Sequence, residues 1–146
     1  MKQEHVIVWR ATEADHPARR AARASMAAVA AGRRDDWLAL FAPGALVEDP
    51  VGPSFLDPAG EGHRDLAAFW DGFVAAVDAF RFEVRDSFAN GPCCANVATI
   101  STTTDGSTMT IDCVLVYTVD EGGLISSLRA HWEPDRALAT LSAAAR

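Results

Sequence analysis

Cysteine, histidine and tyrosine are scarce in this chain, and each scarcity excludes a kind of site. The three cysteines include the adjacent pair Cys93 and Cys94, and with Cys113 they form no CxxC or Cys/His ligand spacing. The four histidines are scattered as well, so the sequence predicts no metal site and no organic cofactor. Buried, reduced thiols of a cytoplasmic protein are the expectation.

Basic charge and long apolar runs are also lacking. Lys and Arg number 13 against 20 Asp and Glu, and the formal charge of -7 would repel nucleic-acid phosphates. No apolar run approaches the ~20 residues that span a membrane. The N-terminus carries no signal-peptide pattern. We therefore expect neither a nucleic-acid nor a membrane partner.

Hydrophobic residues, by contrast, make up 49% of the 146 positions and charged residues 23%, which is typical of a globular protein. The length predicts a single domain over residues 1–146. Within it, residues 1–13 form an N-terminal extension and residues 134–146 a C-terminal tail.

Helical patterns fill the first half of the chain. An Ala-rich stretch over 15–31 predicts a helix capped by Asp15, and a short helix is expected over 35–41. A third, over 65–79, carries apolar residues at three- and four-residue spacing. Alternating residues then predict a run of strands at 82–88, 94–104, 108–119 and 124–132.

Helices followed by a meander of strands predict an α+β domain. We expect a curved antiparallel sheet that wraps into a cone, its mouth closed by the three helices around an apolar pocket. Residues 6–9 could pair as an edge strand or drape over the core, and a short helix could follow Pro134.

The stretch Leu46-Val47-Glu48-Asp49-Pro50-Val51-Gly52 places a carboxylate where a buried strand gives way to a loop. Asp49 could act there as a catalytic base, or it could simply cap a turn. The loop over 53–62 that follows has Phe55 near its tip. It could be a lid over a site, or an ordinary connection whose Phe55 packs into the core.

Asp112 is the most unusual acid in the sequence, because it sits in a strand between Ile111 and Cys113. Alternation allows it to face solvent, and its same-face neighbours are mixed in character. We favour the inward orientation, in which desolvation would raise its pKa and keep it protonated. A neutral carboxyl could then donate a hydrogen bond to an oxyanion while Asp49 acts as the base.

Four motifs carry a family resemblance over about residues 18–133: the segment 36–41, Val-Glu-Asp-Pro-Val-Gly at 47–52, Ile-Asp at 111–112 and Ser-Leu-Arg-Ala-His-Trp at 127–132. With them the chain resembles the ketosteroid isomerase branch of the SnoaL-like, nuclear-transport-factor-2-like superfamily. The resemblance implies a cone-shaped α+β barrel, often dimeric, with a deep apolar pocket. A protonated Asp in the oxyanion hole of ketosteroid isomerase is the standard example of a carboxylic acid that an apolar site keeps neutral.

The resemblance assigns roles to particular residues of this chain. It makes Asp49 the base that moves a proton between carbons, and Asp112 the acid that binds the substrate's carbonyl oxygen. It makes Phe69, Trp70 and Trp132 pocket-lining aromatics, although core packing would also account for them.

One position departs from the family pattern. The family's main oxyanion donor is a tyrosine on the first helix, and Ser25 occupies that position here, while the only tyrosine, Tyr117, lies elsewhere. Losing such a donor typically costs about 3 kcal/mol, roughly a hundredfold in rate. His131 or Trp132 could substitute, but alternation points at most one of them inward.

Three functions remain open from the sequence. The first is isomerisation of an apolar polycyclic ketone through a dienolate, with weak or altered activity because of Ser25. The second is a polyketide or polyether cyclase, a dehydratase or an epoxide hydrolase that uses the same Asp pair. The third is a non-catalytic protein that binds a steroid or another apolar small molecule. By analogy, the resemblance also predicts a homodimer formed through the sheet.

Overall fold

The computed structural model describes residues 6–143; the outer ends of the predicted extension and tail, 1–5 and 144–146, lie outside that range. The strands are β1 (Val6–Trp9), β2 (Phe41–Glu48), β3 (Ala79–Asn90), β4 (Cys93–Thr104), β5 (Ser107–Val119), β6 (Ile125–His131) and β7 (Ser142–Ala143). The helices are α1 (Pro17–Ala31), α2 (Arg34–Leu38), α3 (Leu66–Phe69), which continues as a π-helical turn over Trp70–Val74, and α4 (Pro134–Leu138).

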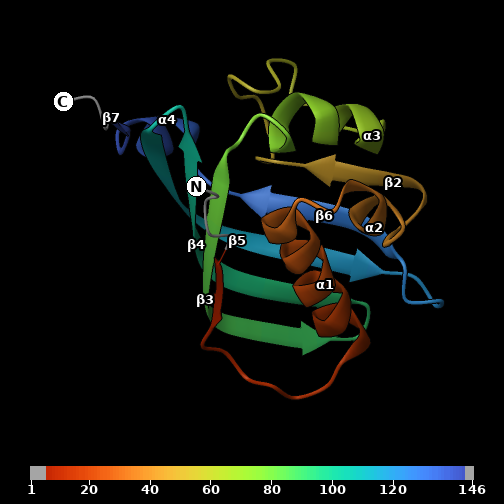
Figure 1. Ribbon diagram of the computed structural model, residues 1–146. Helices are drawn as coiled ribbons and strands as arrows, with labels where there is room; N and C mark the ends of the chain where they lie inside the picture. Colours follow the sequence, from red (N-terminus) through yellow and green to blue (C-terminus); the bar gives the residue numbers. More distant parts are fainter. Residues whose placement is uncertain (1–5, 144–146) are drawn as a thin grey trace.

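All the strands join one curved sheet in the order β1-β3-β4-β5-β6-β2, with β7 pairing to β5. Figure 1 shows α1 lying across one face of this sheet, with α3 beyond the edge strand β2. The α+β prediction is confirmed, but the sheet stays unclosed. It is also mixed, because β1 runs parallel to β3 and β2 parallel to β6. Each of these strands reaches its partner through a long connection, which permits parallel pairing, whereas tight turns join β3, β4 and β5 as antiparallel neighbours.

Helix α1 covers the sheet with a face made mostly of alanine side chains. Ala18, Ala22 and Met26 are fully or almost fully buried. The N-cap is His16, whose Nδ1 accepts a hydrogen bond from the backbone N–H of Ala18 at 3.1 Å, and not Asp15 as predicted. The alanine face allows the helix to lie close to the sheet, so that the floor of the space between them is narrow.

The two shorter helices differ from their predicted lengths. The helix expected over 35–41 ends at Leu38, and β2 already begins at Phe41 and accommodates Pro43-Gly44 through a shift of register before Leu46. The helix expected over 65–79 ends at Val74, where the Trp70 carbonyl accepts from the Ala75 N–H at 2.9 Å. The apolar stripe therefore continues past the helix into the following turn and strand.

Trp37 is the centre of the aromatic core. Its ring lies 4.5 Å from that of Phe41, 6.0 Å from Phe69 and 5.5 Å from Trp70, centroid to centroid. Aromatic pairs at these separations add to the free energy of burying their area. This cluster joins α2, α3 and the start of β2, and it supports one wall of the space beneath α3.

Candidate active site

A cavity of about 460 Å³ lies between α3, the π-helical turn, the 53–62 loop and the inner face of β4 and β5. Its volume is within the range typical of small-molecule sites. Apart from Asp49 and two threonines its wall is almost entirely apolar, formed by Phe55, Leu56, Phe69, Gly72, Phe73, Val74, Ala76, Val77, Phe80, Ile100, Met109, Ile111 and Trp132. The predicted apolar pocket is therefore present.

A second, smaller cavity of about 80 Å³ lies deeper, beneath α1. The two cavities adjoin at the five residues that line both of them: Asp49, Phe69, Val74, Phe80 and Ile100. The polar residues of the deeper cavity are Ser25, Trp37, Asp49 and Tyr117. A small molecule entering the larger cavity would thus meet Asp49 first and the deeper polar groups beyond it.

Asp49 reaches this chamber because two parallel strands end side by side. Glu48, the last residue of β2, pairs with Arg129 of β6, and the residues that follow these strands emerge at the same end of the sheet. Trp132 follows β6 there, and its indole Nε1–H donates to Asp49 Oδ1 at 2.7 Å. That bond fixes the carboxylate against the chamber wall.

Burial raises the pKa of Asp49 from 3.8 to about 6, because desolvation disfavours its charged form, and the hydrogen bond from Trp132 only partly opposes this. Within the part of the chain that the structure describes, Trp132 is the hydrogen-bond partner of this carboxylate. A carboxylate with a pKa near 6 is ionised at neutral pH, yet it binds a proton much more tightly than an ordinary Asp. It is suited to take a proton and return it.

The other predicted aromatics divide into those that line the chamber and one that does not. Phe55, Phe69 and Trp132 line it, and the Phe55 ring stands edge-on to Trp132 with centroids 6.4 Å apart. Phe55 is 49% exposed, at the mouth of the cavity and not packed in the core. Trp70 is buried against Trp37 and lines neither cavity, so the structure does not bring it to the chamber with the other three.

Ser25 lies at the deep end of the chamber, where it forms a polar cluster that sequence reasoning missed. The Nε1–H of Trp37 donates to Ser25 Oγ at 3.0 Å, and the hydroxyl of Tyr117 donates to the same oxygen at 3.3 Å. Tyr117 is 2% exposed and lines the deeper cavity. The strand period could have placed it there, because Tyr117 shares its face of β5 with Ile111 and Leu115.

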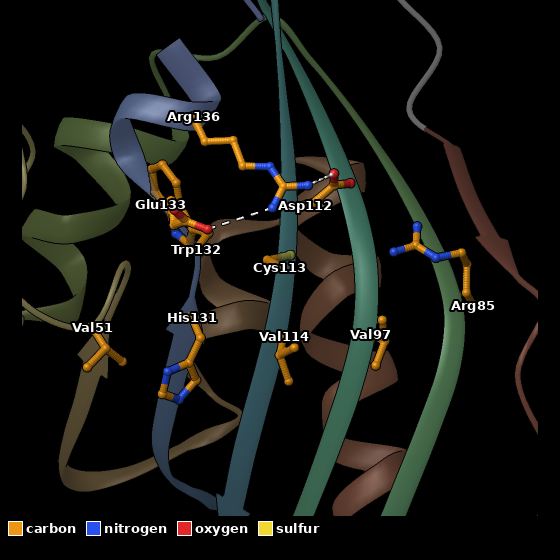
Figure 2. Close-up of a pocket in the computed structure, with 10 residues that line it drawn as sticks. All are labelled: Val51, Arg85, Val97, Asp112, Cys113, Val114, His131, Trp132, Glu133 and Arg136. Atoms are coloured by element: carbon orange, nitrogen blue, oxygen red, sulfur yellow. Dashed lines mark hydrogen bonds and ion pairs between the residues drawn. The ribbon is translucent and has the colours of Figure 1, made fainter. Parts of the chain in front are cut away.

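Asp112 does not face the chamber, and the predicted inward orientation is wrong. Its neighbours Ile111 and Cys113 are buried on the inner face, so the period of two turns Asp112 to the outer face, where 45% of its side chain is exposed. Asp112 lines an outer groove of about 520 Å³. Figure 2 shows Arg136 and Glu133 beside it. His131 and Trp132 both border that groove, but only Trp132 also lines the apolar chamber.

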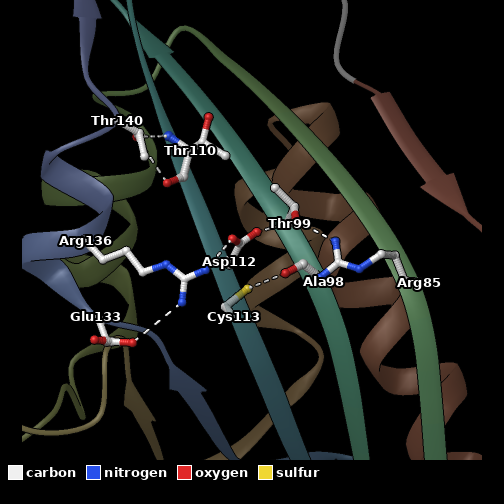
Figure 3. A network of polar contacts seen from close by, with 9 residues as sticks. All are labelled: Arg85, Ala98, Thr99, Thr110, Asp112, Cys113, Glu133, Arg136 and Thr140. Atoms are coloured by element: carbon white, nitrogen blue, oxygen red, sulfur yellow. Dashed lines mark hydrogen bonds and ion pairs between the residues drawn. The ribbon is translucent and has the colours of Figure 1, made fainter.

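The outer face also gives Asp112 the opposite electrostatics. Thr99 donates to its Oδ1 at 2.7 Å and Arg136 to its Oδ2 at 3.0 Å (Figure 3). The hydrogen bond from Thr99, followed by the charge of Arg136, lowers the pKa of Asp112 below 3.8. Asp112 is therefore an ionised carboxylate, and it does not fit the predicted role of a protonated donor to an oxyanion.

Metal-ligating residues, cysteines and apolar helices complete the description of residues 6–143. Within the part of the chain that the structure describes, no three His, Cys, Asp or Glu side chains are grouped to hold a metal ion. All three cysteines are free, with Cys94 and Cys113 buried. None of the helices between residues 6 and 143 combines the length and apolar character needed to cross a bilayer.

Comparison with protein families finds one model, described as a SnoaL-like domain, that matches residues 22–128. No curated protein matches the sequence significantly. The matched stretch contains Ser25, Asp49 and Tyr117. It lies just inside the region of about residues 18–133 over which the sequence resembles this family.

Solved structures include close matches in shape. A Δ5-3-ketosteroid isomerase from a Mycobacterium species is 31% identical with a TM-score of 0.78, covering 88% of this chain and 98% of its own. A Mycobacterium tuberculosis protein in complex with estradiol-17beta-hemisuccinate is 30% identical with a TM-score of 0.78, covering 84% and 98%. An epoxide hydrolase/cyclase-like enzyme of pyran ring formation in salinomycin is 22% identical with a TM-score of 0.67, covering 81% and 92%, and shows the shared fold.

Proposed function

The chain belongs to the SnoaL-like family of the nuclear-transport-factor-2-like superfamily, and from that premise we propose that Asp49 is the general base of a cofactor-independent enzyme acting on an apolar polycyclic ketone. The observation that carries the proposal is a largely desolvated carboxylate, with its pKa raised to about 6, in the wall of a 460 Å³ apolar cavity. Steroid ligands in similar structures support a substrate of this shape and polarity.

The proposed reaction is movement of a double bond into conjugation with the ketone. Asp49 removes a proton from the carbon between the carbonyl and the double bond; the electron pair of that C–H bond forms a new C=C bond to the carbonyl carbon, and the π pair of the carbonyl moves onto its oxygen. The resulting dienolate takes the proton back from Asp49 at the far end of the system. Because one carboxylate both takes and returns the proton, no water or cofactor is consumed.

The test is turnover of a Δ5-3-ketosteroid, followed by the absorbance of the conjugated enone. Wild type should accelerate the isomerisation, and kcat/KM should fall at acid pH with an apparent pKa near 6 as Asp49 is protonated. Asp49→Asn should lose about 100-fold or more, the usual contribution of a positioned base. Glu48→Gln is the matched control, because that neighbouring carboxylate pairs with Arg129 and lines neither cavity. Equal rates for the two variants would refute the role of Asp49.

A second candidate is ring formation or epoxide opening, in which Asp49 would deprotonate a hydroxyl or a water instead of a carbon. The placement of Asp112 outside the chamber favours it, since the predicted acid partner for a dienolate is missing from the site. The shared fold of the salinomycin enzyme is compatible with it. Tight binding of the ketosteroid without any enone formation would move the assignment to this candidate or to a non-catalytic carrier of apolar ligands.

We further propose that two copies associate through the outer face of the sheet. Its groove combines an apolar floor of Val51, Val97 and Val114 with charged side chains of both signs along its edge, Arg85 and Glu133 among them. Light scattering should give twice the mass of 15.6 kDa, and Val114→Asp should halve it. A monomeric wild type would refute this association.

A further inference from the structure

Three polar groups meet at the deep end of the chamber, and they carry one more polar hydrogen than the hydrogen bonds between them use. The cluster holds three polar hydrogens, on Trp37 Nε1, Ser25 Oγ and Tyr117 Oη, but only two hydrogen bonds join them. Every heavy atom in the cluster has a partner. One hydrogen is nevertheless left over, because a hydroxyl can accept twice and still donate once.

The left-over hydrogen has only the cavity to point into. Within the described part of the chain, neither hydroxyl makes a hydrogen bond beyond those two. Besides the cluster and Asp49, the walls of the deeper cavity are apolar, formed by Met26, Val29, Phe69, Val74, Phe80, Phe82, Ile100, Leu115 and Leu128. At about 80 Å³ the space exceeds one water's share of liquid volume, about 30 Å³. It can therefore admit the leading atoms of a ring.

The hydrogen bond between the hydroxyls of Tyr117 and Ser25 is weaker than the one from Trp37 to Ser25. At 3.3 Å it is about 0.5 Å longer than is usual for O–H···O. If the hydroxyl of Ser25 turns towards Tyr117, then Tyr117 holds the left-over hydrogen and the bond from Trp37 to Ser25 is kept. A phenol is also a far better donor to a developing oxyanion than an alcohol, since its pKa is much nearer that of an enol.

We propose that Tyr117 donates a hydrogen bond to the carbonyl oxygen of the substrate while Asp49 faces the acidic carbon, with Ser25 and Trp37 positioning the phenol. This rests on the proposed function, and it assigns the oxygen of the ketone to the deeper cavity. Burial keeps Tyr117 protonated, since it raises the pKa of the phenol. A donor from β5 thus compensates for the serine that stands on α1.

The test uses two steroids that differ by one oxygen: a conjugated 3-ketosteroid and the same steroid without the 3-oxygen. Tyr117→Phe should weaken binding of the ketone about tenfold and change binding of the deoxo steroid less than twofold. In wild type the infrared carbonyl stretch of the bound ketone should move to lower frequency, and in Tyr117→Phe it should return towards its value in an apolar solvent. A merely structural role for Tyr117 would not move this band.

Two further variants keep the result interpretable. Thr118→Val, which removes a hydroxyl from the next residue of β5 outside both cavities, should behave as wild type. Ser25→Ala should keep a smaller shift of the carbonyl band, because the phenol remains but loses the oxygen that positions it. An unshifted band in wild type, or a shifted band in Tyr117→Phe, would overturn the proposal even if Asp49-dependent isomerisation is present. A shifted band without isomerisation would overturn the proposed function alone, and no binding of either steroid would overturn both.

Discussion

Asp49 and Asp112 are two aspartates on opposite faces of one sheet, and their environments could hardly differ more. Asp49 is largely withdrawn from water, which raises its pKa to about 6, and its one neutral donor, Trp132, only partly opposes the rise. Asp112 keeps its water and is held by Thr99 and Arg136, so its pKa is lowered. The same functional group therefore binds a proton more tightly than usual in one place and less tightly in the other.

Asp112 misses the chamber by a single residue along β5. Ile111 lines the chamber, and Asp112, one residue on, lies on the outer face. Apolar neighbours in the sequence do not show that a residue is buried, because in a strand those neighbours belong to the opposite face. The residues that share a face with Asp112 are those two positions away.

The largest effect should come from placing a carboxylate on the inner face of β5, one residue before Asp112. Ile111→Asp would bury a second acid in the chamber, and we expect it to cost about 4 kcal/mol of unfolding free energy at pH 8, with a smaller cost at pH 5 where the acid can be neutral. Urea denaturation at both pH values measures this. Thr110→Asp, on the outer face of the same strand, is the control and should cost less than about 1 kcal/mol. Similar costs for the two variants would contradict the assignment of faces.

Removing the buried charge should have the next largest effect, with the opposite sign. Because the native pKa of Asp49 lies above the unfolded value of 3.8, folding disfavours its ionised form, so its cost develops as pH rises from about 4 to 6 and is constant above. A rise of about two units corresponds to about 3 kcal/mol, so Asp49→Asn should stabilise the protein by up to that amount at pH 8. At pH 3.5 the gain should vanish. A gain that is equal at both pH values would show that it does not come from the charge.

The sequence was a good guide to this fold wherever one physical signal dominated. Period-two alternation located the four long strands, and the alanine stretch located α1 within a few residues. It failed where tertiary context overrides local preference, as at Phe41, which continues a helical pattern but pairs with Ile125 as the start of β2. The parallel pairing of the two edge strands depends on contacts between distant segments, which no local pattern records.

The site was predictable to a similar extent. Asp49 could be singled out because a strand, two acids and Pro-Gly signals coincide, although its burial depends on Trp132, far along the chain. The family pattern places the oxyanion donor on α1 and therefore does not indicate Tyr117, which lies on β5. The cluster draws on three separate elements, and only folding brings its members together. Whether the 53–62 loop moves as a lid stays a prediction, with Phe55 at the cavity mouth.

Loss of the Trp132 donor should widen the difference in pKa between Asp49 and Asp112. Trp132→Phe removes the one group that lowers the pKa of Asp49, and a hydrogen bond to a charged group is typically worth about 1.5–3 kcal/mol, so this pKa should rise by about one to two units above 6. The carboxyl carbon NMR signal of Asp49, followed against pH, measures it without reference to activity. Trp70→Phe is the matched control, since Trp70 packs on Trp37 and does not touch Asp49. An unchanged titration in Trp132→Phe would show that burial alone sets this pKa.

The smallest effect should come from Asp112 itself. Its lowered pKa means that it contributes stability above its unfolded pKa of about 3.8, and that this contribution is lost as pH falls through the native value. Because the side chain is 45% exposed, solvent screens the pair with Arg136, and Asp112→Asn should cost less than about 1 kcal/mol, and still less at high salt. Isomerisation should change less than twofold, because Asp112 does not line the chamber. A hundredfold loss of turnover with an intact fold would instead restore Asp112 to the reaction, and the assignment of the two faces would have to be abandoned.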